Sequence, residues 1–396
     1  MATDVTAERA VLDHVEFDEI VSLTQALVRT HGENPPGDEA AKAQVLAAAC
    51  RGHGLVTTLT EVAPQRPNLS AVLPAGDDPG LLLLGHTDVV PVGDGWTREP
   101  RGGEVRGGRL FGRGSSDMLG GLAACVAAMA AVRRAGVPLR GPVELAATVD
   151  EEDLGLGVRH YLAGGDRSGF VGCVVAEPTD LQTIVAARGD AYVEVRVTGR
   201  AAHSGNPADG ANAVYGAAEV IGDLERWHQE LASDAHPLVG PATWSVGQVR
   251  GGSGTSIVAA ECVVSADRRL LPGESAAEVL DAVRRRIARL ALDRRGLDFE
   301  VSMPMEMPGF ETPQDCELVR TADAALATAG GPGLPLGGWT AACDGGFINR
   351  DAGVPVVVLG PGSVATQAHR PDESVALDEL LVAARAYALL VIRLLS

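Results

Sequence analysis

The chain has 396 residues, 46% of them hydrophobic and 4% aromatic, with 49 glycines and 23 prolines, which excludes a disordered chain and predicts two or three folded domains. The formal net charge of −19 argues against nucleic acid or an anionic membrane as a partner, because both require basic surfaces. The sequence has six scattered cysteines without a CxxC pair and starts without an apolar signal segment, which predicts a cytoplasmic protein. No run of roughly eighteen apolar residues is present, so no membrane span is predicted.

The first part of the chain alternates helical and strand patterns. Apolar residues at helical spacing predict a helix over residues 17–29, and an alanine-rich helix follows at 39–50. Short strands are predicted near 55–60 and 69–73, and four consecutive leucines at 81–84 indicate a fully buried strand. This alternation favours an α/β domain.

The strand at 81–84 delivers polar residues at its end. His86 and Asp88 follow it directly, and Pro91 then directs the backbone away from the sheet. Strand ends are where ligands bind in α/β sheets, and an imidazole with a carboxylate nearby is a common zinc-ligand arrangement. By itself, the segment is equally compatible with a histidine that only ends a strand.

A small-residue helix is predicted at 118–135, and Asp117 precedes it in Gly112-Arg-Gly-Ser-Ser-Asp117. The glycines superficially resemble a dinucleotide-binding loop. That interpretation is rejected because Asp117 occupies the third glycine position and no strong strand precedes the segment. Taken alone, Asp117 is explained as well by a helix cap as by a functional site.

Two later predicted strands also end in acidic residues. The strand at 143–149 ends in Asp150-Glu-Glu-Asp153, and the strand at 171–176 ends in Glu177. The ends of parallel strands meet at one edge of a sheet, so these groups are expected to cluster there. The candidate metal ligands are His86, Asp117, Glu152, Glu177 and His369. Two histidines and three carboxylates suit two zinc-type ions with one carboxylate shared between them.

Glu151 and Glu152 are adjacent, so their side chains leave the strand in different directions. One of them can therefore bind metal while the other faces the substrate. We assign Glu152 to the metal and Glu151 as the general base, although the spacing alone also allows the reverse assignment.

The pattern changes near residue 188 to strands with one polar face, which predicts a small α+β domain with an antiparallel sheet inserted into the larger one. The predicted domain ranges are 1–188, 189–303 and 304–396. The inserted domain is expected to contain strands at 191–198, 243–249 and 261–269 and helices at 212–230 and 276–292. Beyond it, helices are expected at 316–329, 341–350 and 377–395, with a strand at 354–359.

Two polar groups of the inserted domain are candidates for substrate contacts. His203 is placed where a moving lid would bring it to a substrate oxyanion, the alternative being an ordinary surface histidine. Arg268 or Arg269 can clamp a substrate carboxylate, the alternative being a solvated strand end.

The whole pattern resembles the co-catalytic zinc hydrolases that include acetylornithine deacetylase, succinyl-diaminopimelate desuccinylase, aminoacylase and carboxypeptidase G. The resemblance spans essentially the whole chain. It rests on His86-Thr-Asp88-Val-Val-Pro91, Gly112-Arg-Gly-Ser-Ser-Asp117-Met, Asp150-Glu151-Glu152, Ala176-Glu177-Pro178-Thr, Gly199-Arg-Ala-Ala-His203-Ser, Asp267-Arg-Arg269-Leu-Leu-Pro272, Gly360-Pro-Gly and Ala368-His369-Arg-Pro-Asp-Glu. It implies a zinc-peptidase-like three-layer α/β/α catalytic domain with an inserted ferredoxin-like lid that commonly forms homodimers.

The resemblance also implies two zinc sites, one formed by His86, Asp117 and Glu177 and the other by Asp117, Glu152 and His369. A glutamate at 177 is closer to the deacetylase, desuccinylase and carboxypeptidase branches than to the aminoacylases and dipeptidases. Cobalt or manganese are alternatives to zinc, since affinity order and availability decide which metal is used.

The resemblance also implies roles for residues that orient a metal ligand, accept a proton or contact the substrate. Asp88 would orient His86, and Glu151 would be the base. His203, often supplied by the partner subunit's lid in this family, would stabilise the oxyanion, and Arg269 rather than Arg268 would bind a carboxylate.

The sequence departs from the family at three positions: Leu119 replaces a usual lysine, Ser256 stands where an asparagine often contacts the substrate, and Ala259 stands where the family often has proline. The predicted activity is hydrolysis of the amide bond of an N-acyl amino acid or related small carboxylate, by a water shared between the metals. The alternatives are a carboxypeptidase or dipeptidase acting on short peptides, a specialised deacylase or deformylase, for which Ser256 is a reason, and a catalytically silent binding protein.

Overall fold

The computed structural model describes residues 5–396, and the chain divides into two compact units. The first unit extends to Val185 and also includes Thr312–Gly337 and Asp344–Ser396. The second unit contains Ala186–Glu311 and Gly338–Cys343.

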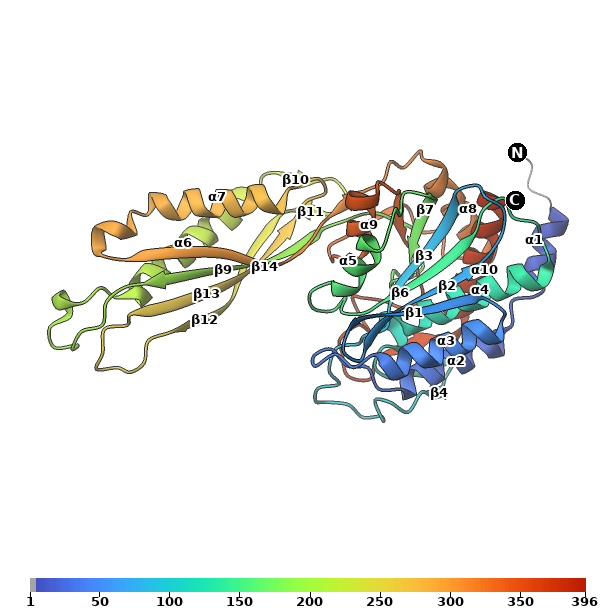
Figure 1. Cartoon of the computed structure of the whole chain (residues 1–396), viewed down its shortest axis with the longest axis horizontal. Coiled ribbons are helices and arrows are strands. Elements are labelled where there is room, and N and C mark those ends of the chain that lie inside the picture. The colour runs from blue at the N-terminus through green and yellow to red at the C-terminus, as the bar shows by residue number, and fades with distance from the viewer. Residues whose placement is uncertain (1–4) are drawn as a thin grey trace. The chain divides into compact units, whose positions relative to one another are not determined.

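A mixed sheet with β3 near its centre forms the framework of the first unit (Figure 1). Over the described residues its order is β1-β2-β6-β3-β7-β17-β8-β15, with β16 beside β8. Its strands within the first unit are β1 (Val56–Ala63), β2 (Arg66–Leu73), β3 (Gly80–His86), β6 (Val143–Thr148), β7 (Phe170–Val175) and β17 (Val356–Val358). The boundary between the units falls within β8 (Ile184–Ala187) and β16 (Gly337–Trp339), and β15 (Phe310–Glu311) belongs to the second unit. Strand β3 runs parallel to both β6 and β7, which confirms the predicted parallel arrangement.

The central strand β3 is apolar on both faces because both faces are covered. Leu81, Leu82, Leu83 and Leu84 are each 0% exposed. A run of leucines without polar alternation is what such a strand requires. Burial of each leucine side chain contributes roughly 1.5–3 kcal/mol, so the strand that leads into His86 is held rigidly in the core.

Helices cover the sheet in two groups, giving the predicted α/β/α layers (Figure 1). Helices α5 and α9 contact each other and the sheet, whereas α2, α4, α8 and α10 belong to a second mutually contacting group. The helices are α1 (Val5–Leu12), α2 (Phe17–Arg29), α3 (Ala40–Gly52), α4 (Gly120–Ala135), α5 (Leu156–Ala163), α8 (Glu317–Ala329), α9 (Gly345–Ala352) and α10 (Leu377–Leu395). A small antiparallel sheet adds β4 (Glu104–Arg106), β5 (Arg109–Phe111) and β18 (Ser374–Ala376).

The segment Ser115–Ala135, which ends in α4, is long and apolar enough to cross a membrane by length and composition, contrary to the sequence prediction. However, 94% of its apolar window is buried inside the protein, as in the core helix of a globular domain. Its glycines serve close packing: a side chain on Gly121 would overlap the carbonyl oxygen of Ala176. This close approach brings the loop of Asp117 next to Glu177.

The second unit is an antiparallel sheet covered by two helices, as predicted. Over residues 186–311 the sheet order is β12-β13-β9-β14. Its main elements are β9 (Gly189–Thr198), α6 (Ala213–Leu231), β12 (Thr243–Gly251), β13 (Glu261–Leu270), α7 (Ala276–Arg289) and β14 (Asp298–Met307), with a short hairpin of β10 (Ala235–His236) and β11 (Gly240–Pro241). Strand β14 was not predicted from the sequence.

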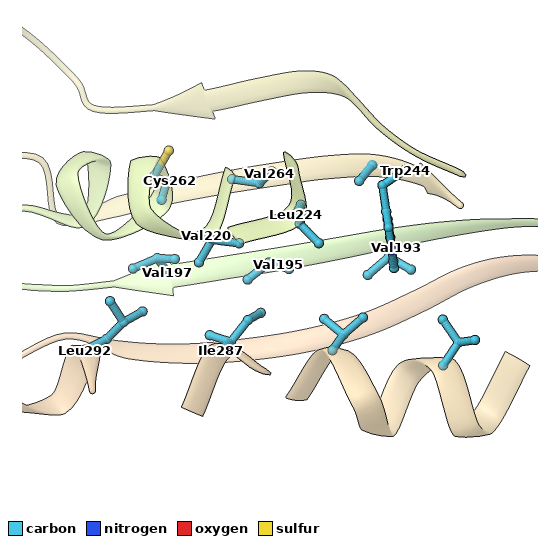
Figure 2. Close-up of a cluster of buried hydrophobic side chains, with 14 of the residues drawn as sticks. Val193, Val195, Val197, Val220, Leu224, Trp244, Cys262, Val264, Ile287 and Leu292 are labelled. Carbon is cyan, nitrogen blue, oxygen red and sulfur yellow. The ribbon is translucent and has the colours of Figure 1, made fainter. Parts of the chain in front are cut away.

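A hydrophobic core holds the sheet of the second unit against its helices (Figure 2). Val193, Val195 and Val197 alternate along β9 and point toward one face, where they pack with Leu224 of α6 and Ile287 of α7. These positions are at most 3% exposed, whereas the residues between them on β9 are more exposed. The period-two pattern therefore reflects a sheet with one covered face.

Candidate metal centre

The candidate ligands are brought together by the parallel register of three strands. In the sheet, His86 of β3 lies opposite Thr148 of β6, and Leu84 of β3 lies opposite Val175 of β7. Residues that follow these strands therefore emerge at the same edge of the sheet. This register explains how His86 and the acidic residues after β6 and β7 become neighbours although they are far apart in the sequence.

The other two candidate ligands, Asp117 and His369, lie on loops that are connected by the buried side chain of Glu373. Glu373, which is 1% exposed, lies four residues after His369. Its Oε1 accepts hydrogen bonds from the backbone N–H groups of Ser116 (2.9 Å) and Asp117 (3.0 Å), and its Oε2 pairs with Arg113 (2.7 Å). The loop of Asp117 is thereby fixed to the loop of His369.

Asp117 lies between the two histidines. Its Oδ1 is 3.3 Å from Nε2 of His86, and its Oδ2 is 3.3 Å from Nε2 of His369. Glu177 completes the first group, with Oε1 3.3 Å from Nε2 of His86, and Glu152 completes the second, with Oε2 3.0 Å from Nε2 of His369. Within each group the candidate ligand atoms lie within 4.8 Å of one another. Two groups that share one carboxylate match the geometry of a dinuclear centre.

The electrostatics of these side chains also fit cations. Burial opposes a charge on His86, but the carboxylates of Glu177, Asp117 and Asp88 outweigh it and raise its pKa well above the usual value. Hydrogen bonds to Asp117 and Glu152 raise the pKa of His369 to about 10. The carboxylates that hold a proton on each ring would also hold a divalent cation there, and metal binding would release those protons.

The two adjacent glutamates occupy different places, a geometry compatible with the predicted assignment of Glu152 to the metal and Glu151 as the base. Glu152 belongs to the second ligand group, whereas Glu151 lies outside both groups with Oε2 3.8 Å from Nε2 of His86. Burial, supported by the charges of Glu177 and Asp344 and opposed by His86, raises the pKa of Glu151 well above its usual value. A raised pKa makes a carboxylate a stronger proton acceptor, which suits a general base.

Asp88 contacts His86 mainly through its backbone. Nδ1 of His86 is 3.0 Å from the carbonyl oxygen of Asp88 and 3.6 Å from its Oδ1. The Asp88 carboxylate accepts hydrogen bonds from the backbone N–H groups of Glu151 (3.3 Å) and Glu152 (3.1 Å). Asp88 therefore connects the imidazole to the turn that carries both glutamates.

Comparison of the sequence with models of protein families identifies the family of the chain. Residues 82–393 match the model of peptidase family M20/M25/M40. The chain belongs to this family. Its members are hydrolases that act on C–N bonds and typically carry a dinuclear metal site, in agreement with the two ligand groups that share Asp117.

The relatives within the M20 family include both deacetylases and peptidases. The chain is 31% identical to the acetylornithine deacetylase of Edwardsiella ictaluri (strain 93-146) over 309 residues, which covers 76% of each chain. It is 32% identical to the acetylornithine deacetylase of Proteus mirabilis (strain HI4320) over 311 residues, which covers 77% of each.

Among solved structures, the M20 metallo-carboxypeptidase Sso-CP2 from Sulfolobus solfataricus has a TM-score of 0.78 at 18% identity, with 95% of this chain and 100% of that chain covered. The aminopeptidase PepT from Bacillus cereus ATCC 10987 has a TM-score of 0.73 at 21% identity, with 95% of this chain and 98% of that chain covered. At such low identity these structures establish the shared M20 fold.

The three other predicted site residues belong to the second unit. Nδ1 of His203 accepts a hydrogen bond from the backbone of Gly205, and the adjacent Ser204 N–H donates to the carbonyl oxygen of Ser256 (3.0 Å), so the segments of His203 and Ser256 adjoin. Arg269 pairs with Asp267 (2.9 Å) and Asp190 (3.2 Å). The guanidinium predicted to bind a substrate carboxylate is thus already between two carboxylates of its own unit.

Several buried polar residues behind the M20 site were not predicted from the sequence. Asn34, Glu39 and Arg66 form hydrogen bonds and ion pairs that reach Asp88 and the residues after β6. Burial raises the pKa of Asp344 to about 7, and its Oδ2 accepts a hydrogen bond from Thr148 (2.7 Å). The sequence carries no local signal for these residues, because each lies in a turn, at a helix end or at the start of a strand, and its partners are distant along the chain.

Proposed function

We propose that this M20 enzyme is a deacylase that hydrolyses the amide bond of an N-acyl amino acid or a similar small carboxylate. The observation that supports the proposal most directly is the position of Glu151, a carboxylate with a raised pKa whose side chain is 11% exposed and lies beside the two ligand groups joined by Asp117. The acetylornithine deacetylases at 31% and 32% identity support the choice of an acylated amino acid as substrate class. The mixture of two histidines and three carboxylates supports zinc as the metal, with cobalt or manganese as substitutes.

The side chains have separate tasks in this reaction. Two bound divalent cations would polarise the amide carbonyl and lower the pKa of a water toward about 7. Glu151 accepts the proton of the attacking water and delivers it to the leaving amine, which its position close to the ligand groups and its raised pKa support. His203 donates a hydrogen bond to the oxyanion, in line with its place on an exposed loop of the second unit.

A peptidase of the same fold is the second candidate. The structures with TM-scores of 0.73 to 0.78 include an aminopeptidase and a metallo-carboxypeptidase. At identities of 18% and 21% these two structures support a shared fold and not a shared substrate. They are therefore weaker support for an activity than the acetylornithine deacetylases. Ser256 keeps a deformylase or another specialised deacylase as a further alternative.

Release of free amine from a panel of N-acetyl, N-succinyl and N-formyl amino acids and dipeptides decides between these activities. The zinc-loaded protein is expected to release amine from one group of N-acyl amino acids, and the Glu151→Ala variant serves as the blank. Cleavage of dipeptides alone would replace the deacylase proposal by the peptidase. Silence of a protein with two bound zinc ions toward the whole panel would refute both activities.

We also propose that the protein forms a homodimer through its second unit. β12 is an edge strand of that unit's sheet, and its Val249 is 50% exposed. Tyr215 at the start of α6 is 63% exposed and Ile257 is 44% exposed, so apolar side chains gather on this unit. Exposed apolar side chains beside an unpaired strand favour association with a second copy.

Light scattering on the eluting protein tests the dimer. The expected mass is twice the 40.8 kDa of one chain, and Tyr215→Glu is expected to shift the population toward the monomer, because a carboxylate in an apolar interface is costly. Glu219→Gln on the same helix is the matched control. A wild-type mass of 40.8 kDa at micromolar concentration would contradict the proposal.

A further inference from the structure

Asn34 joins two buried carboxylates behind the metal centre. It is 2% exposed, and its Nδ2 donates one hydrogen bond to Oδ2 of Asp88 (3.0 Å) and one to Oδ1 of Asp150 (3.0 Å). Asp88 is 0% exposed and Asp150 is 1% exposed. Both hydrogens of one amide group are therefore used to hold two negative charges close together.

These hydrogen bonds close a ring with the main chain. The Asp88 carboxylate that accepts from Asn34 also accepts the N–H groups of Glu151 (3.3 Å) and Glu152 (3.1 Å), which follow Asp150 directly. The path runs from the side chain of Asp150 through Asn34 and Asp88 back to the main chain one and two residues after Asp150. The turn that carries the proposed base and one ligand is consequently fixed at both ends.

The backbone conformation of Asp150 shows why the turn requires this support. Its φ of 68° lies in the left-handed region, which residues with a Cβ seldom adopt. The Oδ2 of Asp150 accepts the N–H groups of Leu154 (3.2 Å) and Leu156 (3.3 Å), and its Oδ1 pairs with Arg66 (2.7 Å). Surrounding contacts must compensate for this backbone conformation. Among them, the hydrogen bond from Asn34 connects Asp150 to Asp88.

Asn34 is itself anchored independently of these carboxylates. Its backbone N–H donates to the carbonyl oxygen of Val89 (2.9 Å), the residue after Asp88, and Glu33 pairs with Val89 as an isolated bridge. Arg66, on the other side of Asp150, is held by Glu39, whose carboxylate accepts from Arg66 Nη2 (2.6 Å). The amide group of Asn34 therefore has a fixed place from which to orient the carboxylates.

We propose that Asn34 is a positioning residue for the reaction: its amide group aligns Asp88 with Asp150 and so sets the directions of Glu151 and Glu152. The inference rests on the proposed roles of these two glutamates. The Asn34 side chain donates to Asp88 and Asp150, and neither residue belongs to the two ligand groups. Its removal would therefore lower turnover and zinc affinity through the turn, since partners behind a metal site contribute about 10–100-fold to affinity or activity.

The test compares Asn34→Ala, which removes both donors, with Asn34→Ser, which keeps one hydroxyl donor. Asn34→Ala is expected to lower kcat by about 10–100-fold with KM nearly unchanged, and Asn34→Ser to fall between it and the wild type. Asn349→Ala is the matched control, because Asn349 donates only to the carbonyl oxygen of Val354 (3.1 Å) outside the site. An equal loss in Asn349→Ala would overturn the proposal.

A second readout is independent of substrate. Hydrogen–deuterium exchange of the metal-free protein, resolved to the Glu151 and Glu152 amides, is expected to speed up about fivefold in Asn34→Ala while the strand β3 stays protected, because the loss of one hydrogen bond changes a local opening equilibrium by about this factor. Zinc affinity, measured by competition with a chelator, is expected to weaken in parallel. Unchanged exchange at both amides would refute the positioning role even if no substrate of the enzyme were found, so this result is separate from a failure of the proposed function.

Discussion

Replacing Glu151 by alanine or glutamine is expected to lower kcat by about 10²–10⁴-fold while two metal ions per chain remain bound. The reason is geometric: Glu151 lies beside His86 but outside both ligand groups, so its removal takes away the proton acceptor and leaves the ligands in place. Steady-state kinetics on the substrate that the panel identifies, together with metal analysis of the purified variant, measure both halves of this expectation.

The matched control for Glu151 is Glu144→Gln on the preceding strand β6. Glu144 is a glutamate of similar exposure, with 9% of the residue exposed against 11% of the Glu151 side chain, and it accepts a hydrogen bond from Ser70 (2.8 Å) away from the site. Its replacement is expected to leave kcat within about threefold, in line with a loss of stability alone. A Glu151→Gln enzyme that kept a tenth of wild-type turnover, or that lost its metal, would show that Glu151 is not the base.

The sequence predicted those parts of the site that depend on patterns within short stretches of the chain. A run of leucines can only be a buried element, and polar residues that directly follow such elements must gather where parallel strands end. That argument placed His86, Glu152 and Glu177 correctly at one edge of the sheet, and the parallel register of β3, β6 and β7 confirms its premise. For Asp117 the local pattern was ambiguous, because a helix cap explained it equally well, and only the set of five candidate ligands taken together included it.

The remaining features depend on partners that are distant in the sequence. Asn34 and Arg66 lie 116 and 84 residues before Asp150, and nothing local distinguishes them from residues of ordinary turns and strands. Strand β14 escaped prediction because its sequence, Asp298–Met307, mixes charged residues with methionine and proline on a half-exposed edge. The ion pair between Arg269 and Asp190 was likewise not predictable, because the two residues meet only when β9 and β13 pair in the sheet.

The same buried network contains the one lysine of the sequence. All other basic residues among the 33 lysines and arginines are arginine, whereas Lys42 in α3 is 1% exposed. Burial lowers the pKa of Lys42 from 10.5 to about 8, although the charges of Asp88, Glu39 and Glu373 act in the opposite direction. A lysine can lose its proton when it is buried, which an arginine cannot do.

This pKa has a definite consequence for stability. Between pH 8 and 10.5 the unfolded chain keeps a proton on Lys42 that the folded protein has lost, so the free energy of unfolding rises with pH in this window. The difference between 10.5 and about 8, at about 1.4 kcal/mol per pH unit, amounts to about 3 kcal/mol. Below pH 8 both states are protonated, and the folded protein bears the full cost of the buried charge.

Lys42→Met is therefore expected to raise the free energy of unfolding by up to about 3 kcal/mol at pH 7, and by progressively less as the pH approaches 10.5. Lys42→Arg, which keeps its charge at every accessible pH, is expected to destabilise the protein instead. Because the chain has one lysine, ¹³Cε-lysine labelling gives a single side-chain resonance whose titration midpoint should lie at about 8. A midpoint at or above 10.5, or a Lys42→Met protein less stable than wild type at pH 7, would show that the network stabilises the charge more than burial opposes it.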